Sequence, residues 1–175
     1  MSRHVIFWLL LLSFGSTFQI ASTQGRGASA RSQGKQQTVK IYLAMEPKEG
    51  EPFDPQNPQN LHPVMRMVNR AAPLRPTLEA LLAGPNATEA AQGYIDISFG
   101  AKLTDVKIKN GAVRADFIMP PGAAFSGDTS PFLFKAAVEM TIKQFPNVKK
   151  VIVCLDGEED IGSESGEPPK KCPEL

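Results

Sequence analysis

The sequence predicts an α+β fold in which a mixed β-sheet carries two helices packed on one face. Three observations support this prediction. Apolar side chains recur at a 3.6-residue period through residues 130–145, as in an amphipathic helix. Residues 151–155 form a short apolar run, which is typical of a strand that is covered on both faces or central in a sheet. Asn110-Gly111 separates two alternating stretches, which is the strongest short signal for a β-hairpin.

Alternation and turn residues predict four elements before the hairpin, namely strands over residues 38–43, 64–68 and 94–98 and a helix over residues 76–83. Residues 45–63 contain five prolines, which predicts a long loop. Gly84 suits the left-handed position that follows a helix. Asn86-Ala87-Thr88 matches the glycosylation sequon, but we interpret it as a polar surface turn.

The two-residue turn fixes the register of the predicted hairpin. The expected core-side pairs are Ile108 with Val113, Val106 with Ala115, and Thr104 with Phe117. The expected outer pairs are Lys107 with Arg114 and Asp105 with Asp116. Opposite charges meet along the diagonals of the outer face, so we expect that face to be solvated.

A long helix follows the hairpin. Ser130 is its predicted N-cap, and Pro131 suits its first position because the missing N–H has no partner there. The stripe expected to face the core consists of Phe134, Ala137, Val138, Thr141, Ile142 and Phe145. Pro146 ends the helix before the last predicted strand.

Length and charge restrict the class of protein. The chain has 175 residues, of which 19 are Lys or Arg and 18 are Asp or Glu, giving a net charge of +1. This length predicts one folded domain, and the balance of charge argues against a nucleic-acid-binding surface, which is usually clearly basic.

Residues 1–30 have the pattern of a secretory signal peptide: a basic start, an apolar stretch over residues 5–14, and a cleavage site at Ala28-Ser29-Ala30, with Ile20-Ala21-Ser22 as an earlier option. The alternative is an uncleaved N-terminal anchor. No cysteine precedes Cys154, so a lipoprotein is not expected. We therefore expect a periplasmic or secreted protein with no stable membrane span after cleavage. The expected division is signal peptide 1–30, flexible leader 31–37, folded domain 38–157, and acidic, proline-rich tail 158–175.

Cys154 and Cys172 are a candidate disulfide, because an even cysteine count in an exported chain favours a bridge. Such a bridge would hold the tail against the fold. The alternative is a reduced Cys154 packed in the core and a free Cys172.

Catalytic, metal and cofactor chemistry is not expected. His62 is the one histidine after the predicted signal peptide, and no G-x-S-x-G nucleophile motif occurs. One His and two Cys are too few for a typical zinc site. Glycines do not form a phosphate-binding loop, and we interpret the acidic run at 156–160 as a solvated turn rather than a calcium loop.

The ordered combination of segments VKIYLA, TLEALLAGP, VKIKNGAVRADF and AVEMTIKQFPNVKKVIVCLDG resembles the GerMN domain family of sporulation and spore-germination proteins. The resemblance covers residues 38–157. It implies an extracytoplasmic, non-enzymatic domain, similar to the ring-building modules of secretion and sporulation complexes, that acts by protein–protein packing.

Two functional hypotheses follow. The preferred one is an assembly module of the bacterial cell envelope that packs against an envelope protein or against itself. The family's name points to sporulation or germination, although the single domain and the missing lipid-anchoring cysteine weaken that transfer. The alternative is a domain that binds a small molecule or a cell-wall fragment, with residues 45–63 as a lid.

Overall fold

The computed structural model describes residues 35–46, 60–125, 130–159, 161 and 170–175. The chain divides into the units Met1–Ser32 and Gln33–Leu175, and every described residue lies in the second. The predicted signal peptide, most of the leader and the interior of the proline-rich loop therefore lie outside the described residues. None of the described helices is long and apolar enough to cross a membrane.

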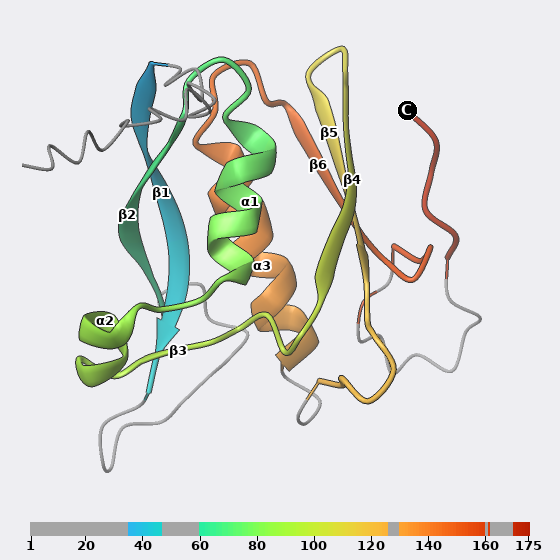
Figure 1. Cartoon of the computed structure of the whole chain (residues 1–175). Coiled ribbons are helices and arrows are strands. Elements are labelled where there is room, and N and C mark those ends of the chain that lie inside the picture. Colours follow the sequence, from blue (N-terminus) through green and yellow to red (C-terminus); the bar gives the residue numbers. More distant parts are fainter. Residues whose placement is uncertain (1–34, 47–59, 126–129, 160, 162–169) are drawn as a thin grey trace, which may run out of the picture. The chain divides into compact units, whose positions relative to one another are not determined.

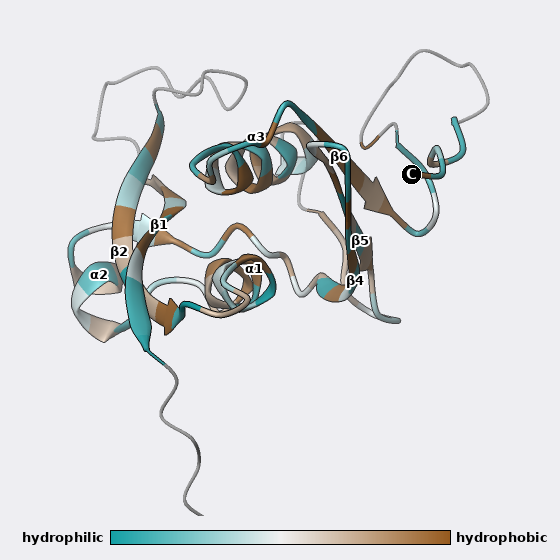
Figure 2. Ribbon diagram, turned by 90° about the horizontal axis from the view of Figure 1, so that it is seen from above, coloured by the Kyte–Doolittle hydropathy of each residue, from teal (hydrophilic) through white to brown (hydrophobic). Residues whose placement is uncertain are grey.

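The described elements follow one another in the order β1 (Gln36–Met45), β2 (Leu61–Asn69), α1 (Leu74–Leu82), α2 (Ala87–Ala91), β3 (Tyr94–Ile95), β4 (Lys102–Lys109), β5 (Ala112–Ile118), α3 (Ser130–Lys143) and β6 (Lys150–Leu155) (Figure 1). The α+β class is confirmed. The strands, however, are divided between two three-stranded sheets, β2-β1-β3 and β4-β5-β6, instead of forming one. Helices α1 and α3 contact each other and lie between the two sheets (Figure 2).

Helix α3 explains why the sheets stay separate. The backbone N–H of Tyr42 on β1 donates to the Thr141 hydroxyl at 3.3 Å. The Lys40 N–H donates to the Gln144 side chain at 2.7 Å, and the Gln144 amide donates to the Lys40 carbonyl at 2.6 Å. These side chains occupy an edge of β1 that another strand would otherwise pair with.

The core forms where both helices meet the sheets. All predicted stripe residues of α3 from Phe134 to Ile142 are fully buried, and Phe145 is half-buried. Phe134 packs edge-on against Phe117 of β5, with ring centroids 5.1 Å apart. The amphipathic pattern of the long helix is thus confirmed.

The hairpin register is confirmed near the turn and wrong at its far end. Val106 pairs with Ala115 and Ile108 with Val113, as predicted. A bulge at Thr104 shifts the pairing, so Phe117 lies opposite Leu103. The Thr104 hydroxyl donates to the Asp116 carbonyl at 2.9 Å, so this backbone carbonyl keeps a hydrogen-bond partner at the bulge.

Strand β6 is an edge strand, but it is covered on both faces, with Val153 buried on one side and Cys154 on the other. Cys154 forms a disulfide with Cys172, and the Cys172 N–H donates to the Gly157 carbonyl at 2.9 Å. The last described residues of the tail therefore lie against the outer face of the second sheet.

The prediction of a solvated outer face is wrong at Arg114 and Asp116, whose side chains are only 15% and 16% exposed. They pair with each other along β5 at 2.7 Å instead of along the predicted diagonals. Arg114 also donates to the Pro173 carbonyl at 2.8 Å. The tail covers Arg114 and Asp116 and shields them from water. The alternating pattern of the hairpin sequence gives no sign of this cover.

Helix α2 replaces the predicted polar turn. Asn86 accepts hydrogen bonds from the Thr88 and Glu89 N–H groups, and the Glu89 carboxylate accepts from the Asn86 N–H. Arg66 of β2 binds both oxygens of Glu89, at 2.7 and 2.6 Å. This bidentate ion pair joins α2 to the first sheet.

The Arg66–Glu89 pair predicts a pH-dependent contribution to stability. Hydrogen bonding from Arg66, helped by the Asn86 N–H, lowers the pKa of Glu89 although burial opposes this. A lowered folded-state pKa means that the unfolded chain binds more protons, so this stability is present above the ordinary glutamate pKa of about 4.3 and is lost as pH falls through the lowered value. Glu89→Gln should cost ~1 kcal/mol at pH 7. The cost should vanish in acid, as measured by urea unfolding; a cost that persists there would contradict the role of the charge.

Candidate interaction site

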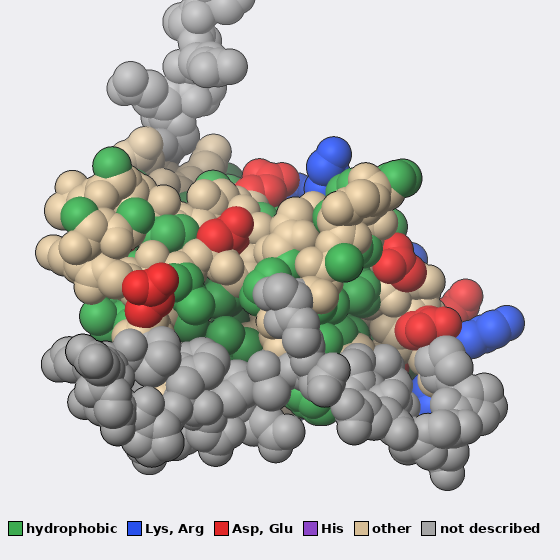
Figure 3. Space-filling view, turned by 90° about the horizontal axis from the view of Figure 1, so that it is seen from below, with side chains coloured by type: hydrophobic (Ala, Val, Ile, Leu, Met, Phe, Trp, Pro, Cys, Tyr) green, Lys and Arg blue, Asp and Glu red, His purple; other side chains and the backbone are tan. Residues whose placement is uncertain are grey.

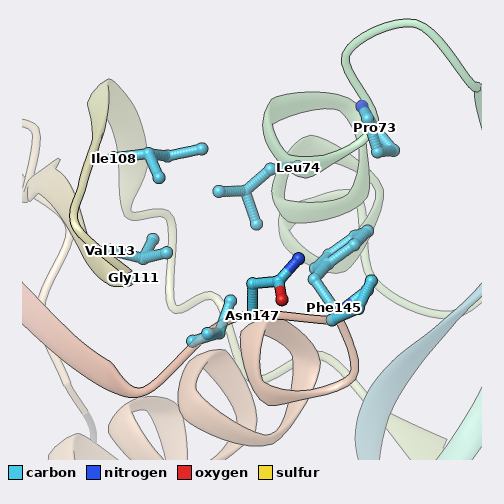
Figure 4. Close-up of a pocket in the computed structure, with 9 residues that line it drawn as sticks. Pro73, Leu74, Ile108, Gly111, Val113, Phe145 and Asn147 are labelled. Atoms are coloured by element: carbon cyan, nitrogen blue, oxygen red, sulfur yellow. The ribbon is translucent and has the colours of Figure 1, made fainter.

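An apolar groove opens at the end of the domain where the β4–β5 hairpin turns (Figure 4). One part has a volume of about 220 Å³ and is lined by Pro73, Leu74, Ile108, Gly111, Val113, Phe145, Pro146, Asn147 and Val148. A second part of about 390 Å³ shares Pro73, Leu74 and Ile108 and continues to Arg75. We call the two parts the groove. Most of the residues that line the groove are apolar, as in surfaces that bind a ligand or a partner.

The turns at Gly111 and Asn147 position two walls of the groove. Helix α3 ends at Lys143, and in the turn that follows it Asn147, next to Pro146, adopts a positive φ of 72°. The Gly111 carbonyl accepts from the Lys149 N–H at 2.8 Å, which fixes the hairpin tip against the α3–β6 turn. A Cβ on Gly111 would approach the Asn147 carbonyl oxygen to 2.9 Å, so this contact requires glycine as well as the positive φ of the turn. Two walls of the groove are therefore preformed.

Ile108 is the most exposed large apolar side chain that the structure describes, at 66%. The prediction that it is a core residue is wrong, although its partner Val113 is fully buried. Ile108 and Leu74 point toward each other across the groove, and the space between them is not filled by described side chains (Figure 4). An isoleucine exposed to this extent beside a hollow is available to a partner.

The groove lies at a basic end of the domain. Lys35, Arg70, Lys109, Lys149 and Lys150 come from four separate segments and are all exposed. Lys35 and Arg70 are joined by a backbone hydrogen bond of 2.8 Å, and Lys150 lies beside Ala112. None of the five forms an ion pair with a described residue, and we call them the basic rim. Arg75 and Lys107 also lie here, but both approach Asp105.

The predicted site residues lie elsewhere. The disulfide Cys154–Cys172 is on the outer face of the second sheet, away from the groove lining. Ligand atoms of Asp116 and both cysteines lie within 4.8 Å of one another, but the two sulfurs are bonded to each other and offer no thiolate to a metal. His62 lies on β2 opposite Leu43 and belongs to no cluster of potential metal ligands among the described residues.

Sequence reasoning missed both the groove and the basic rim. The net charge of +1 conceals the rim, because its cations gather only when distant segments meet at one end of the fold. Alternation assigns Ile108 to the core face correctly but cannot show how far the helices extend along that face. No local pattern in the sequence carries this information.

Known proteins resemble this chain both in sequence and in fold. Residues 40–161 match the family model Germane, described as sporulation and spore germination. The chain is similar in structure to the tandem GerMN domains of the sporulation protein GerM from Bacillus subtilis, with 23% identity and a TM-score of 0.51, over 84% of this chain and 48% of that one. It thus spans about half the length of that tandem structure.

The first GerMN domain of the same Bacillus subtilis protein is also similar, with 16% identity and a TM-score of 0.46, over 77% of this chain and 97% of that one. No curated protein matches the chain. The family match covers most of the sequence and all described helices and strands except the start of β1. The chain therefore belongs to the Germane family of sporulation and spore germination.

Proposed function

We propose that this chain is an exported, non-catalytic module of the cell envelope, and that a protein partner docks in the groove. The proposal rests on the preformed apolar groove and on Ile108, which is exposed at its edge. Apolar surface of this kind, surrounded by charged residues, is typical of protein interaction sites. The Cys154–Cys172 disulfide supports export, because disulfides persist in oxidising compartments.

The test is capture of a partner through the groove. Ile108→Glu places a charge in the apolar contact and, because Ile108 is 66% exposed, should leave the fold intact. We expect cross-linked pull-down from envelope extract to lose the partner, with binding weakened about tenfold or more. Met65→Glu is the matched control, since Met65 is 55% exposed on the first sheet and outside the groove.

Two results would contradict the proposal. One is equal capture by Ile108→Glu and wild type. The other is a clear rise in melting temperature with cell-wall fragments and no protein captured, which would favour a binding domain for such fragments. Circular dichroism of both variants verifies that the fold is retained.

A further inference from the structure

The groove consists of two hollows that meet at one pair of side chains. The parts of about 220 and about 390 Å³ share Leu74 and Ile108, which point toward each other across the opening (Figure 4). Phe145 and Val148 line the first hollow, and Ala72 lines the second. A partner that fills both hollows therefore needs at least two apolar side chains on one face.

Cations without a described ion-pair partner flank both hollows. Arg70 directly precedes Ala71 of the groove lining, and its N–H donates to the Lys35 carbonyl at 2.8 Å. At the other wall, side-chain carbons of Lys149 lie 3.2 Å from the place that a Cβ on Gly111 would take. All three cations are exposed, and none forms an ion pair with a described residue. Their charges are therefore open to a partner.

Carboxylates are scarce at this end of the domain. The segments that meet here are residues 35–36, 70–79, 105–113 and 145–150. Together they contain seven Lys or Arg and two Asp or Glu. The two acidic residues are Glu79 and Asp105, and Arg75 approaches both, at 3.5 and 3.9 Å. The groove end therefore has an excess of positive charge, although the whole chain has a net charge of only +1.

The opposite end of the domain does not supply the complementary charge. Its described surface shows both acidic and basic side chains (Figure 3). Lys102 is exposed there, opposite Ile118 on the neighbouring strand. Glu174 of the tail follows Pro173 on the outer face of the second sheet, outside the groove lining. The described surface of a second copy thus offers no strongly acidic end, so we look for the negative charge in a different protein.

The backbone around the groove argues against an added β-strand. At the free edge of β4 the Thr104 carbonyl accepts from Arg75 at 3.0 Å, and the Val106 N–H donates to the Asp105 carboxylate at 2.8 Å. An added strand would find these backbone groups occupied. A helix satisfies its own backbone hydrogen bonds and enters a groove through side chains three or four residues apart.

Building on the function proposed above, we propose that the groove binds an acidic amphipathic helix of another envelope protein. Apolar side chains of that helix enter the two hollows and pack on Ile108 and Leu74. Asp and Glu side chains on its flanks face Lys35, Arg70 and Lys149. The apolar contacts supply most of the affinity, whereas the charges steer the encounter and select acidic partners over basic ones.

Two synthetic helical peptides test the proposal against the full chain. Both carry leucine at positions i, i+3, i+4 and i+7. The remaining positions are Glu and Ala in one peptide and Lys and Ala in the other. We expect the Glu peptide to bind about tenfold more tightly than the Lys peptide, as measured by fluorescence anisotropy, and this preference to shrink in high salt.

Three variants of the chain separate the apolar contact from the charges. Ile108→Ser removes the apolar contact without adding charge, and should weaken binding of the Glu peptide about tenfold. Arg70→Glu combined with Lys149→Glu should abolish the preference for the Glu peptide. Lys102→Glu is the matched control, because Lys102 is also exposed and has no ion-pair partner among the described residues but lies at the opposite end. It should keep the preference.

Equal binding of the two peptides, or a preference that the double variant retains, would overturn the proposal. If neither peptide binds while Ile108→Glu still loses an envelope partner, the acidic helix is wrong and the proposed function stands. If neither peptide nor any envelope protein binds, both fail. Wild type that binds phosphatidylglycerol vesicles and neither peptide would assign the cations to a membrane surface instead. Self-association that Ile108→Ser abolishes, without peptide binding, would assign the groove to a second copy.

Discussion

Replacing Phe134 with alanine is expected to lower the free energy of unfolding by about 3–5 kcal/mol. Phe134 is fully buried and contacts the rings of Phe117 and Phe125. Removing its ring leaves a cavity where α3, β5 and Phe125 meet, and the helices between two sheets cannot easily collapse into it. Chemical denaturation at neutral pH measures the loss.

The matched control is Phe132→Ala on the same helix. Phe132 is only half-buried, so the same change of side chain should cost clearly less. Equal costs for the two variants would contradict the assignment of Phe134 to the centre of the core.

Breaking the Cys154–Cys172 disulfide is expected to cost about 3 kcal/mol, because the bridge restricts the unfolded chain and spans 18 residues. Cys172→Ser tests this while leaving Cys154 buried as a small apolar side chain. The variant should lose stability, and a reductant should lower the stability of wild type to the same level. Urea unfolding with and without reductant measures both.

Cys172→Ser in reductant is the control, since its stability should not change further. The unreduced wild type, once denatured, should show no free thiols. Two free thiols, or a stability unaffected by reductant, would contradict a structural bridge. Loss of the bridge should also release Pro173 from Arg114, so protease should remove the tail of the variant faster than that of wild type.

Local patterns predicted most elements of this fold. The stripe on α3 and the Asn110-Gly111 turn are strong signals because each depends on a single periodicity or a single backbone requirement. The division into two sheets could not be predicted, because it depends on Thr141 and Gln144 reaching β1 about a hundred residues earlier in the chain. Helix α2 could have been found, since Asn86 and Glu89 have the spacing of a capping box.

The candidate site was less accessible to sequence reasoning than the fold. Ile108 was assigned to the correct face of its strand, but its exposure depends on Leu74 and Phe145, which come from distant parts of the chain. The basic rim is equally non-local, since Lys35, Lys109 and Lys149 come from separate segments of the chain. A nearly neutral composition therefore says little about the charge of any one surface.

A protein partner that docks in the groove should lie within reach of residue 108. Site-specific photo-crosslinking in the native host measures this contact, with the reactive amino acid placed at position 108 and, as a control, at position 65. Both Ile108 and Met65 are exposed, so neither replacement should disturb the fold. We predict a protein adduct from position 108 and none from position 65. Adducts from position 65 alone, or from both positions equally, would contradict docking in the groove.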